Sequence, residues 1–371
     1  SIYRALYRLF LGVVSSALVT AVVFYLATPI TFISPKITLV LVAGWGFLLL
    51  GLWRSLGYFI FFRKAFRQKV LIITDEKYPD LPLGLVKVGG VEYSIASLPA
   101  SGLDLEKVVG GHKINEVVIA CDYRQNPDLA RDLVNVASGG VKIVEWSLFY
   151  EKMYAKIPIV GIDYLWFLHH TDEAEKKNYE RLKRILDIFV SLLLYFFIFM
   201  PLLPFLALGI RISSRGPVFY RQKRVGKKGE IFMLVKLRTM DIGAESNGAQ
   251  WAEKNDPRIT WFGRFLRRTR LDEMPQLWNV LKGEMSLVGP RPERPEFTTT
   301  LIEKIPFYNH RHVVRPGLTG HAQIVYPYAS SIEDSIEKVA YDLYYIKNRS
   351  LFIYIKIVLR TIKIVLSFRG R

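Results

Sequence analysis

The sequence predicts an α+β membrane protein in three parts: a transmembrane helical hairpin, a small Rossmann-like α/β domain, and a mostly helical C-terminal domain with a re-entrant membrane helix. Its 371 residues are enough for more than one compact core. Hydrophobic residues make up 51% of the chain and charged residues 23%, so long apolar segments must coexist with water-facing ones. The spacing of apolar residues then separates strands from helices. We expect the three parts at residues 1–67, 68–170 and 178–371.

Two apolar runs near the N-terminus, residues 6–28 and 37–62, are each long enough to cross the hydrocarbon core of a bilayer. Arginine and lysine residues flank the outer ends of this pair, whereas the connector between the runs contains only Lys36. Cytoplasmic loops carry an excess of lysine and arginine. We therefore expect a transmembrane hairpin with both of its ends in the cytoplasm.

The segment 68–170 has the pattern of a small α/β domain. Buried strands are predicted at Val70–Thr74, Glu116–Ala120 and Val141–Val144, with a helix near Pro127–Val136. A dinucleotide site needs a glycine-rich turn after the first strand, but residues 73–79 contain no glycine. We expect a Rossmann-like domain without a nucleotide motif. The single cysteine of the chain excludes an intrachain disulfide and an all-cysteine zinc site.

The apolar segment 185–210 has basic residues on both flanks and is interrupted by Pro201 and Pro204. A straight span would place one basic cluster on the wrong side of the membrane. A helix that enters one leaflet, breaks near Pro201 and returns avoids this conflict, because proline kinks a helix. We expect a re-entrant helix; a kinked full span is the alternative.

Residues 351–368 predict a C-terminal helix that lies in the membrane interface. Lys356, Arg360 and Lys363 recur at helical spacing against an almost continuous apolar background. That pattern is typical of a helix on anionic lipid. The alternative is an ordinary surface helix packed on a domain core.

A basic segment between Lys236 and Arg315 contains the adjacent carboxylates Asp272 and Glu273. Apolar residues at helical spacing follow, Pro275 is tolerated only in the first turn, and Gly283 would end the helix. Asp272 is then expected at or next to a helix N-cap, where the free N–H groups favour an ionised carboxylate and attract phosphate.

Paired carboxylates among arginines suit phosphoryl chemistry, in which one carboxylate attacks phosphorus and a divalent metal offsets the diphosphate charge. Hard oxygen ligands imply Mg²⁺ or Mn²⁺ at Asp272 and Glu273. For Asp272 alone, the alternative is a structural N-cap. For the arginines, the alternative is a basic surface that binds nucleic acid, because a formal charge of +18 does not by itself select a partner.

Arg291 stands in the segment Gly289–Pro292, which should be stiff because each proline fixes its own φ and restricts the residue before it. The planar guanidinium of arginine matches two phosphate oxygens, so Arg291 is a candidate clamp on a diphosphate. A plain surface turn is the alternative. His310, His312 and His321 lack the spacing of a zinc site.

Together these motifs resemble the bacterial sugar transferase family, the monotopic phosphoglycosyl transferases that initiate exopolysaccharide and O-antigen synthesis. The chain departs from the family pattern at Met200, where serine is usual before the proline, and at His321, where tryptophan is usual. Larger members carry four transmembrane helices before a Rossmann-like domain, and the sequence leaves open whether further helices precede Ser1. The motifs that carry the resemblance are, in order, residues 183–187, 216–222, 236–240, 272–273, 289–293 and 315–323.

The resemblance implies transfer of a sugar-1-phosphate from a nucleotide-sugar donor to polyprenyl phosphate at the cytoplasmic face of the bacterial inner membrane. Asp272 would be the nucleophile that forms a phosphosugar intermediate, and Glu273 would coordinate Mg²⁺ or handle a proton. Membrane lipids are expected partners and nucleic acid is not. The substrate-binding residues would be Lys236, Arg238, Arg267, Gln276, Asn279, Arg291, Arg294 and Arg315.

Some alternatives stay open at this point. A membrane-anchored scaffold that grips polyanions without turnover would share the basic composition. The sequence does not identify the sugar, the nucleotide or the acceptor length. It also leaves open what the α/β domain binds and whether a homodimer forms through it.

Overall fold

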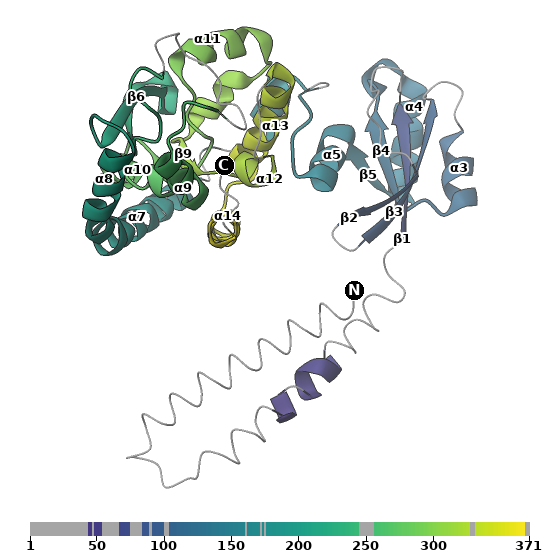
Figure 1. Ribbon diagram of the computed structural model, residues 1–371. Helices are drawn as coiled ribbons and strands as arrows, with labels where there is room; N and C mark the ends of the chain where they lie inside the picture. Colours follow the sequence, from purple (N-terminus) through teal and green to yellow (C-terminus); the bar gives the residue numbers. More distant parts are fainter. Residues whose placement is uncertain are drawn as a thin grey trace. The chain divides into compact units, whose positions relative to one another are not determined.

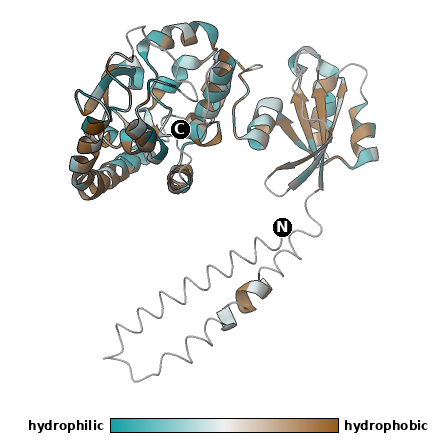
Figure 2. Cartoon of the chain, viewed as in Figure 1, coloured by the Kyte–Doolittle hydropathy of each residue, from teal (hydrophilic) through white to brown (hydrophobic). Residues whose placement is uncertain are grey.

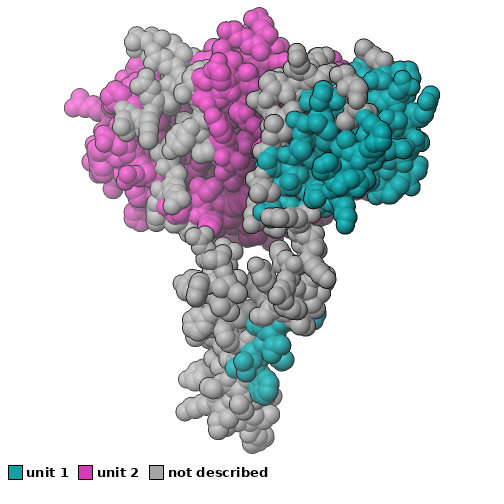
Figure 3. All heavy atoms as spheres, turned by 90° about the vertical axis from the view of Figure 1, so that its right-hand side faces the viewer, with its two compact units in different colours: residues 1–144 teal, residues 145–371 magenta. Residues whose placement is uncertain are grey.

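The computed structural model describes residues 44–46, 48–53, 67–74, 84–88, 91–99, 104–159, 162–170, 173, 176–244, 256–326 and 331–367. They belong to two compact units, Ser1–Val144 and Glu145–Arg371, drawn in different colours in Figure 3. Residues 44–46 and 48–53 are helical, with side chains such as Trp53 exposed. The rest of the predicted hairpin lies outside the described residues.

The first unit contains a five-stranded sheet in the order β2-β3-β1-β4-β5 (Figure 1). The central strand β1 runs parallel to β3 and β4, and the edge strand β2 pairs antiparallel with β3. The predicted strands correspond to β1, β4 and β5, whereas the β2–β3 pair was not predicted. The strands are β1 (Arg67–Thr74), β2 (Gly84–Val88), β3 (Val91–Pro99), β4 (Glu116–Ala120) and β5 (Lys142–Glu145).

One face of this sheet packs against α3 (Leu105–His112) and α4 (Pro127–Ser138). Alternate residues of β1, Leu71 and Ile73, share a core with Leu129 of α4. A strand directs successive side chains to opposite faces, so this alternation turns every second residue toward the helices. The parallel strands with helices packed on them confirm the predicted mixed α/β architecture.

Two helices that follow the sheet in sequence belong to the second unit: α5 (Trp146–Tyr154) and α6 (Tyr164–His170). Trp166 and Phe167 of α6 lie in the same hydrophobic core as Leu277 and Leu343. The compact unit that contains the sheet therefore ends at Val144, and residues 145–170 pack with the C-terminal part of the chain.

A long apolar helical segment, Lys177–Ser213, has the length and composition to cross a membrane. It consists of α7 (Lys177–Leu194), a π-helical turn (Tyr195–Phe199) and α8 (Met200–Ser213), and Figure 1 shows α7 and α8 running in different directions. Pro201 and Pro204 lack the N–H groups that an α-helix would use there. The π-turn directly precedes them, with the Met200 N–H donated to the Tyr195 carbonyl. The predicted helix break is thus a π-turn followed by prolines.

The rest of the second unit is mostly helical, with a short antiparallel pair β6–β7 and a short parallel pair β8–β9. Its core contains Leu277, Val288, Tyr308 and Leu343. Its remaining elements are β6 (Phe219–Val225), β7 (Ile231–Leu237), α9 (Trp261–Thr269), η4 (Leu271–Glu273), α10 (Gln276–Lys282), β8 (Ser286–Val288), α11 (Pro295–Lys304), η5 (Tyr308–Val313), β9 (Gly317–Thr319), α12 (His321–Val325), α13 (Ile332–Asn348) and α14 (Leu351–Leu366).

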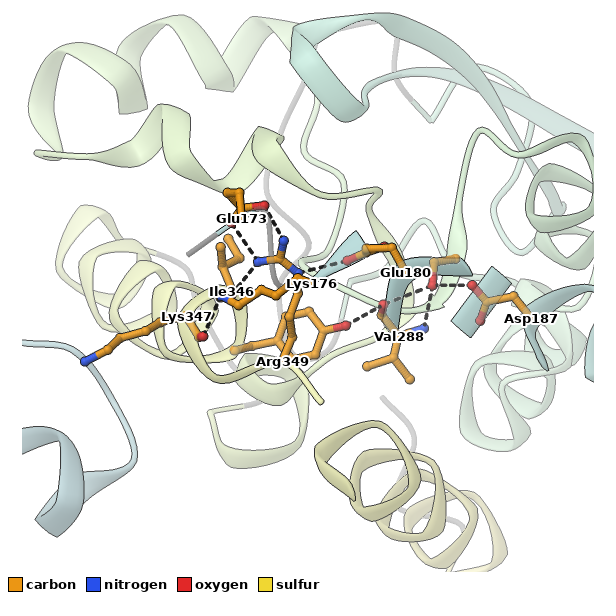
Figure 4. A network of polar contacts seen from close by, with 10 residues as sticks. Glu173, Lys176, Glu180, Asp187, Val288, Ile346, Lys347 and Arg349 are labelled. Atoms are coloured by element: carbon orange, nitrogen blue, oxygen red, sulfur yellow. Dashed lines mark hydrogen bonds and ion pairs between the residues drawn. The ribbon is translucent and has the colours of Figure 1, made fainter. Parts of the chain in front are cut away.

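A buried polar network ties α7 to strand β8 and helix α14, and Figure 4 shows its part around Asp187 and Val288. The carboxylate of Asp187 accepts hydrogen bonds from Ser286 Oγ at 2.7 Å and from the Leu287 N–H at 3.1 Å. The Tyr354 hydroxyl donates to the same carboxylate at 3.0 Å. Removing one hydrogen-bond partner leaves a buried polar group of the network without that bond, at a cost of about 1–3 kcal/mol for each group left unsatisfied. The network therefore fixes α7 beside β8, the strand that leads into Gly289.

At the end of α13, Arg349 forms the other half of this network. Its Nε donates to Glu180 of α7 at 2.8 Å, and its terminal nitrogens bind Glu173 and the Ile346 carbonyl. The guanidinium is almost fully buried. A buried arginine with two carboxylate partners fixes the start of α7 against α13.

Helix α14 has two apolar faces. One face packs into the core through Tyr354 and Ile357. The other carries exposed apolar residues at helical spacing, of which Phe352 is 75% exposed and Leu359 61%. Figure 2 shows hydrophobic residues along α14 as well as along α7 and α8. The exposed apolar face distinguishes α14 from an ordinary surface helix, which turns polar residues to solvent.

Candidate active site

The two adjacent carboxylates lie in the turn that connects α9 to α10. Arg270 adopts a left-handed conformation with φ of 56°, which ends α9 and starts the short helical turn η4. Asp272 and Glu273 lie in η4, and Pro275 takes the N-cap position of α10. The expectation that Asp272 lies at or next to this N-cap is wrong by three residues, because η4 forms its own turn. The predicted end of the helix at Gly283 is confirmed, with φ of 90°.

Asp272 is buried, with 9% of its surface exposed. Burial and the neighbouring charge of Glu273 raise the pKa of Asp272 to about 7, although Lys236, Arg267 and Arg291 oppose this shift. Removal from water disfavours the charged form of a carboxylate, and a like charge beside it adds to that cost. Asp272 is therefore a carboxylate held close to the point of protonation near neutral pH.

Glu273 is in the opposite electrostatic position. Arg291 Nη2 donates to Glu273 Oε1 at 2.7 Å, and Arg270 lies 3.4 Å from the other carboxylate oxygen. Burial raises the pKa of Glu273, but the charges of Arg291 and Arg270 outweigh it and the net pKa lies below the ordinary value. Neighbouring carboxylates with pKa values pushed apart can take different chemical roles.

The cations around Asp272 are Lys236 of β7, Arg267 of α9 and Arg291 of the segment after β8. Lys236 of β7 lies over the ring of Tyr220 at 4.9 Å, and Arg267 of α9 donates through Nε to Thr239 Oγ1 at 2.9 Å. Burial and the charge of Arg224 lower the pKa of Lys236 to about 8. The structure thus brings together the predicted residues Lys236, Arg267 and Arg291 around the carboxylates.

Arg291 differs from the other cations because its side chain is 43% exposed. It binds Glu273 with one terminal nitrogen while part of its guanidinium remains in contact with solvent. An arginine in this position can contact an incoming anion without first breaking a buried ion pair.

Two predicted substrate-binding residues bond to main-chain groups, Asn279 from within α10 and Arg315 at the C-terminal end of α10. The Asn279 amide donates to the Met233 carbonyl at 2.8 Å and accepts from the Val235 N–H at 3.2 Å, so it joins α10 to β7. Arg315 donates through Nε to the Gly283 carbonyl at 2.9 Å, at the opposite end of α10 from Asp272. Both side chains hold main-chain groups of the fold.

The remaining predicted substrate-binding residues are Arg238, Arg294 and Gln276. Arg238 is buried and donates to the Ser214 carbonyl at 2.9 Å. Arg294 precedes α11, 3.5 Å from Glu296, and lies over the ring of Phe297. Gln276 is the buried first residue of α10.

Three glycines allow the backbone after β8 to pack tightly against β9. The Gly289 N–H donates to the Thr319 carbonyl at 2.8 Å. A Cβ atom at Gly289 would lie 2.4 Å from the Arg315 carbonyl oxygen, and one at Gly317 would lie 2.1 Å from the Gly289 nitrogen. A Cβ atom at Gly320 would lie 2.2 Å from the Gly289 carbonyl oxygen. This glycine stack, Gly289 with Gly317 and Gly320, positions the segment that carries Arg291.

The sequence reasoning missed Arg224 and Arg311. Arg224 Nη2 donates to Gln222 Oε1 at 2.7 Å, and Arg311 lies in a buried ion pair with Asp342. Arg224 follows the 216–222 motif, which was a usable signal. Arg311 had no comparable signal, since its partner lies 31 residues further along the chain.

Comparison with known sequences identifies the chain through its C-terminal half. A family model described as bacterial sugar transferase matches residues 178–368. The chain belongs to the bacterial sugar transferase family. The match includes both carboxylates, the surrounding cations and the long apolar helix.

Relatives carry names that differ in the sugar. An Aeromonas hydrophila protein, 44% identical over 52% of this chain and 45% of its own length, is named a UDP-N-acetylgalactosamine-undecaprenyl-phosphate N-acetylgalactosaminephosphotransferase. A Caulobacter vibrioides protein, 42% identical over 50% of this chain and 70% of its own length, is named a UDP-glucose:undecaprenyl-phosphate glucose-1-phosphate transferase. An Erwinia amylovora protein, 33% identical over 69% of this chain and 56% of its own length, is named a UDP-galactose-lipid carrier transferase. The chain spans about half the length of the first and third relatives.

Proposed function

We propose that this member of the family is a phosphoglycosyl transferase that moves a sugar-1-phosphate from a UDP-hexose to undecaprenyl phosphate and releases UMP. The observation that carries the proposal is the Asp272–Glu273 pair, buried among Lys236, Arg267 and Arg291. Each of the three relatives' names contains a UDP-sugar together with undecaprenyl phosphate or a lipid carrier, and the names differ in the sugar. The proposal therefore names a donor class and leaves the hexose open. The step would initiate synthesis of a membrane-linked glycan.

The proposed mechanism has two displacements at phosphorus. A carboxylate oxygen of Asp272 bonds to the sugar-bearing phosphorus, and the bond from this phosphorus to the UMP oxygen breaks. An oxygen of undecaprenyl phosphate then bonds to the same phosphorus, and Asp272 leaves as a carboxylate. Lys236, Arg267 and Arg291 favour the ionised form of Asp272 and offset the charge of the diphosphate.

A divalent ion, Mg²⁺ or Mn²⁺, is part of the proposal. Asp272 and Glu273 offer adjacent carboxylate oxygens, the donor atoms that Mg²⁺ prefers, and such sites usually take their other ligands from water and substrate phosphates. The described residues contain no group of three or more side chains of the kinds that hold a metal without substrate. A bound ion would neutralise charge on the diphosphate. Glu273, fixed by Arg291 and Arg270, would orient the pair.

The membrane arrangement is also a proposal. The exposed apolar residues of α7, α8 and α14 would enter the lipid, with α7 and α8 forming a re-entrant element that leaves the carboxylates on the cytoplasmic side. Lys356, Arg360 and Lys363 of α14 would lie at the anionic headgroups. The lipid-linked acceptor would then reach the site from the membrane.

The donor class and the covalent step can be tested with the full chain in nanodiscs. Protein, Mg²⁺, undecaprenyl phosphate and a panel of UDP-hexoses are incubated, and UMP release is measured. A second sample without acceptor is quenched and searched by mass spectrometry for a phosphosugar on the peptide that contains Asp272. We expect one donor to give both signals. A polyanion-binding scaffold would bind donors weakly at high salt and release no UMP with any of them.

The re-entrant arrangement has its own test. Single cysteines are introduced near residues 178 and 216 in a Cys121→Ser background, and each is labelled from one side of sealed membrane vesicles with a reagent that does not cross lipid. We expect both positions to react from the same side. Labelling from opposite sides would show that Lys177–Ser213 spans the membrane.

A further inference from the structure

The backbone that carries Arg291 is held at four consecutive carbonyl groups. The carbonyls of residues 290–293 each accept a hydrogen bond from a group elsewhere in the chain. In order, the donors are the Gly317 N–H at 2.8 Å, Arg311 Nη2 at 3.1 Å, Arg224 Nη1 at 3.1 Å and the Val225 N–H at 3.0 Å. Two of these donors are arginine side chains and two are main-chain N–H groups.

Each of the three side-chain nitrogens of Arg311 donates a hydrogen bond inside the protein. Its side chain is 6% exposed, and Nε donates to Asp342 Oδ2 at 2.8 Å. Nη1 donates to the Tyr308 hydroxyl at 2.8 Å, and Nη2 donates to the carbonyl of Arg291 at 3.1 Å. The opposing charge of Asp342, whose side chain is 2% exposed, contributes to raising the pKa of Arg311 despite its burial. Arg311 is therefore a fixed cation that faces the protein interior.

Arg291 has the complementary character. Its side chain is exposed by 43%, and its terminal nitrogen Nη2 contacts Glu273 at 2.7 Å. A long exposed side chain keeps its direction only if the backbone beneath it is held. The bond from Arg311 holds the peptide group of Arg291 itself, so it acts on the position from which the exposed guanidinium extends.

We propose that Arg311, fixed by Asp342, is a positioning residue that sets Arg291 against Glu273. This inference rests on the proposed phosphoglycosyl transferase function. Arg311 touches neither carboxylate of the candidate active site, and its effect passes through the main chain of Arg291. Lysine cannot replace it, because a single ammonium group cannot span Asp342, Tyr308 and the Arg291 carbonyl in one plane.

The test is a double-mutant cycle in the full chain, with Arg311→Lys, Arg291→Lys and the double variant assayed for UMP release. If Arg311 acts through Arg291, both single variants should lose activity in the same way: the loss should appear in kcat, in the KM for the donor, or in both, to the same relative extent in each variant. We expect Arg311→Lys to lower kcat/KM about tenfold. The double variant should be within about twofold to threefold of Arg291→Lys alone, because the second change has little left to disturb.

Arg349→Lys is the matched control. Arg349 is also a buried arginine with carboxylate partners and a main-chain carbonyl, but it bonds to Glu173, Glu180 and Ile346 instead of the segment 289–293. Its loss should reduce the unfolding temperature, and its effect on kcat/KM should multiply with that of Arg291→Lys.

The positioning role is wrong if the fold-loss of kcat/KM in the double variant equals the product of the fold-losses in Arg311→Lys and Arg291→Lys. It is also wrong if Arg311→Lys leaves kcat/KM unchanged in folded protein. Where Arg311→Lys does not fold, Asp342→Asn takes its place in the same cycle, since it keeps the guanidinium and removes only the charge of its carboxylate partner. Absence of turnover in the unmutated protein would instead refute the proposed function. If the unmutated protein turns over and the fold-losses in kcat/KM multiply, only the role of Arg311 is refuted.

Discussion

The two ends of α10 use charged side chains in opposite ways. Beyond its N-terminal end lie Asp272 and Glu273, with cations gathered around them. At its C-terminal end, Arg184 donates to the carbonyls of Val280 and Leu281 at 2.6 and 2.8 Å. Arg315 donates to the carbonyl of Gly283, two residues after Leu281. Acidic groups near the start and basic groups near the end both agree with the direction of the helix dipole.

The difference lies in what the charges contact. At the C-terminal end, the arginines bind main-chain oxygens that no further turn of helix would satisfy. At the N-terminal end, side chains contact one another, and Arg291 is still partly open to solvent. One end thus stabilises the fold, whereas the other keeps charge available for a ligand. Four predictions test this division.

The largest expected effect is on Asp272 itself. Asp272→Asn should lower turnover by at least about a thousandfold, because an amide is a poor nucleophile at phosphorus. Glu273→Gln should slow the reaction less, since it keeps the shape of the side chain. The measurement is UMP release with a check for traces of unmutated enzyme. Substantial turnover by Asp272→Asn would favour direct transfer without a covalent intermediate.

The next effect concerns Arg291. Arg291→Lys keeps the charge but loses the planar pair of donors, so kcat/KM should fall about 10-fold to 100-fold while the unfolding temperature changes little. Circular dichroism melts in detergent provide the folding control. Full activity in a folded Arg291→Lys protein would remove this residue from the donor site.

Arg315 should show the reverse pattern. Arg315→Met leaves the Gly283 carbonyl without its partner, so the free energy of unfolding should fall by about 1–3 kcal/mol. Turnover of the folded fraction should stay within about threefold of the unmutated protein, because Arg315 lies at the far end of α10. A large loss of activity with unchanged stability would restore the phosphate-binding role that its motif suggested.

The smallest effect is a pH-dependent gain in stability. A carboxylate with a raised pKa contributes stability that is complete below its unfolded pKa near 3.8 and is lost as the pH rises to about 7. The amide in Asp272→Asn does not ionise, so the variant does not lose this stability as the pH rises. In EDTA, the free energy of unfolding of the variant should exceed that of the unmutated protein at about pH 8, and by less at about pH 5. An equal difference at both pH values would mean that Asp272 titrates normally.

Local patterns in the sequence were enough to predict several features. The apolar runs of β1 and β4 predicted two central strands, and Gly283 marked the end of α10 because a left-handed residue closes helices. Basic residues near the Asp272–Glu273 pair predicted the cluster that includes Lys236 and Arg267.

Long-range pairing was not predictable in the same way. Arg315 and Arg291 look alike in the sequence, each next to a proline, yet one binds a carbonyl and the other a carboxylate. The Arg311–Asp342 pair likewise joins two separate elements, η5 and α13. The site of each arginine is set by contacts between segments far apart in the chain, which residue spacing does not encode.

The glycine stack formed by Gly289, Gly317 and Gly320 limits how the candidate active site could be redesigned. Each position would place a methyl group within 2.4 Å of a backbone atom of a facing segment, and a backbone cannot swing aside as a side chain can. Libraries that seek a new donor sugar should therefore keep these three codons fixed. Their diversity belongs at positions where a new side chain has room, because in the stack even alanine, the smallest step from glycine, would displace the loop that presents Arg291.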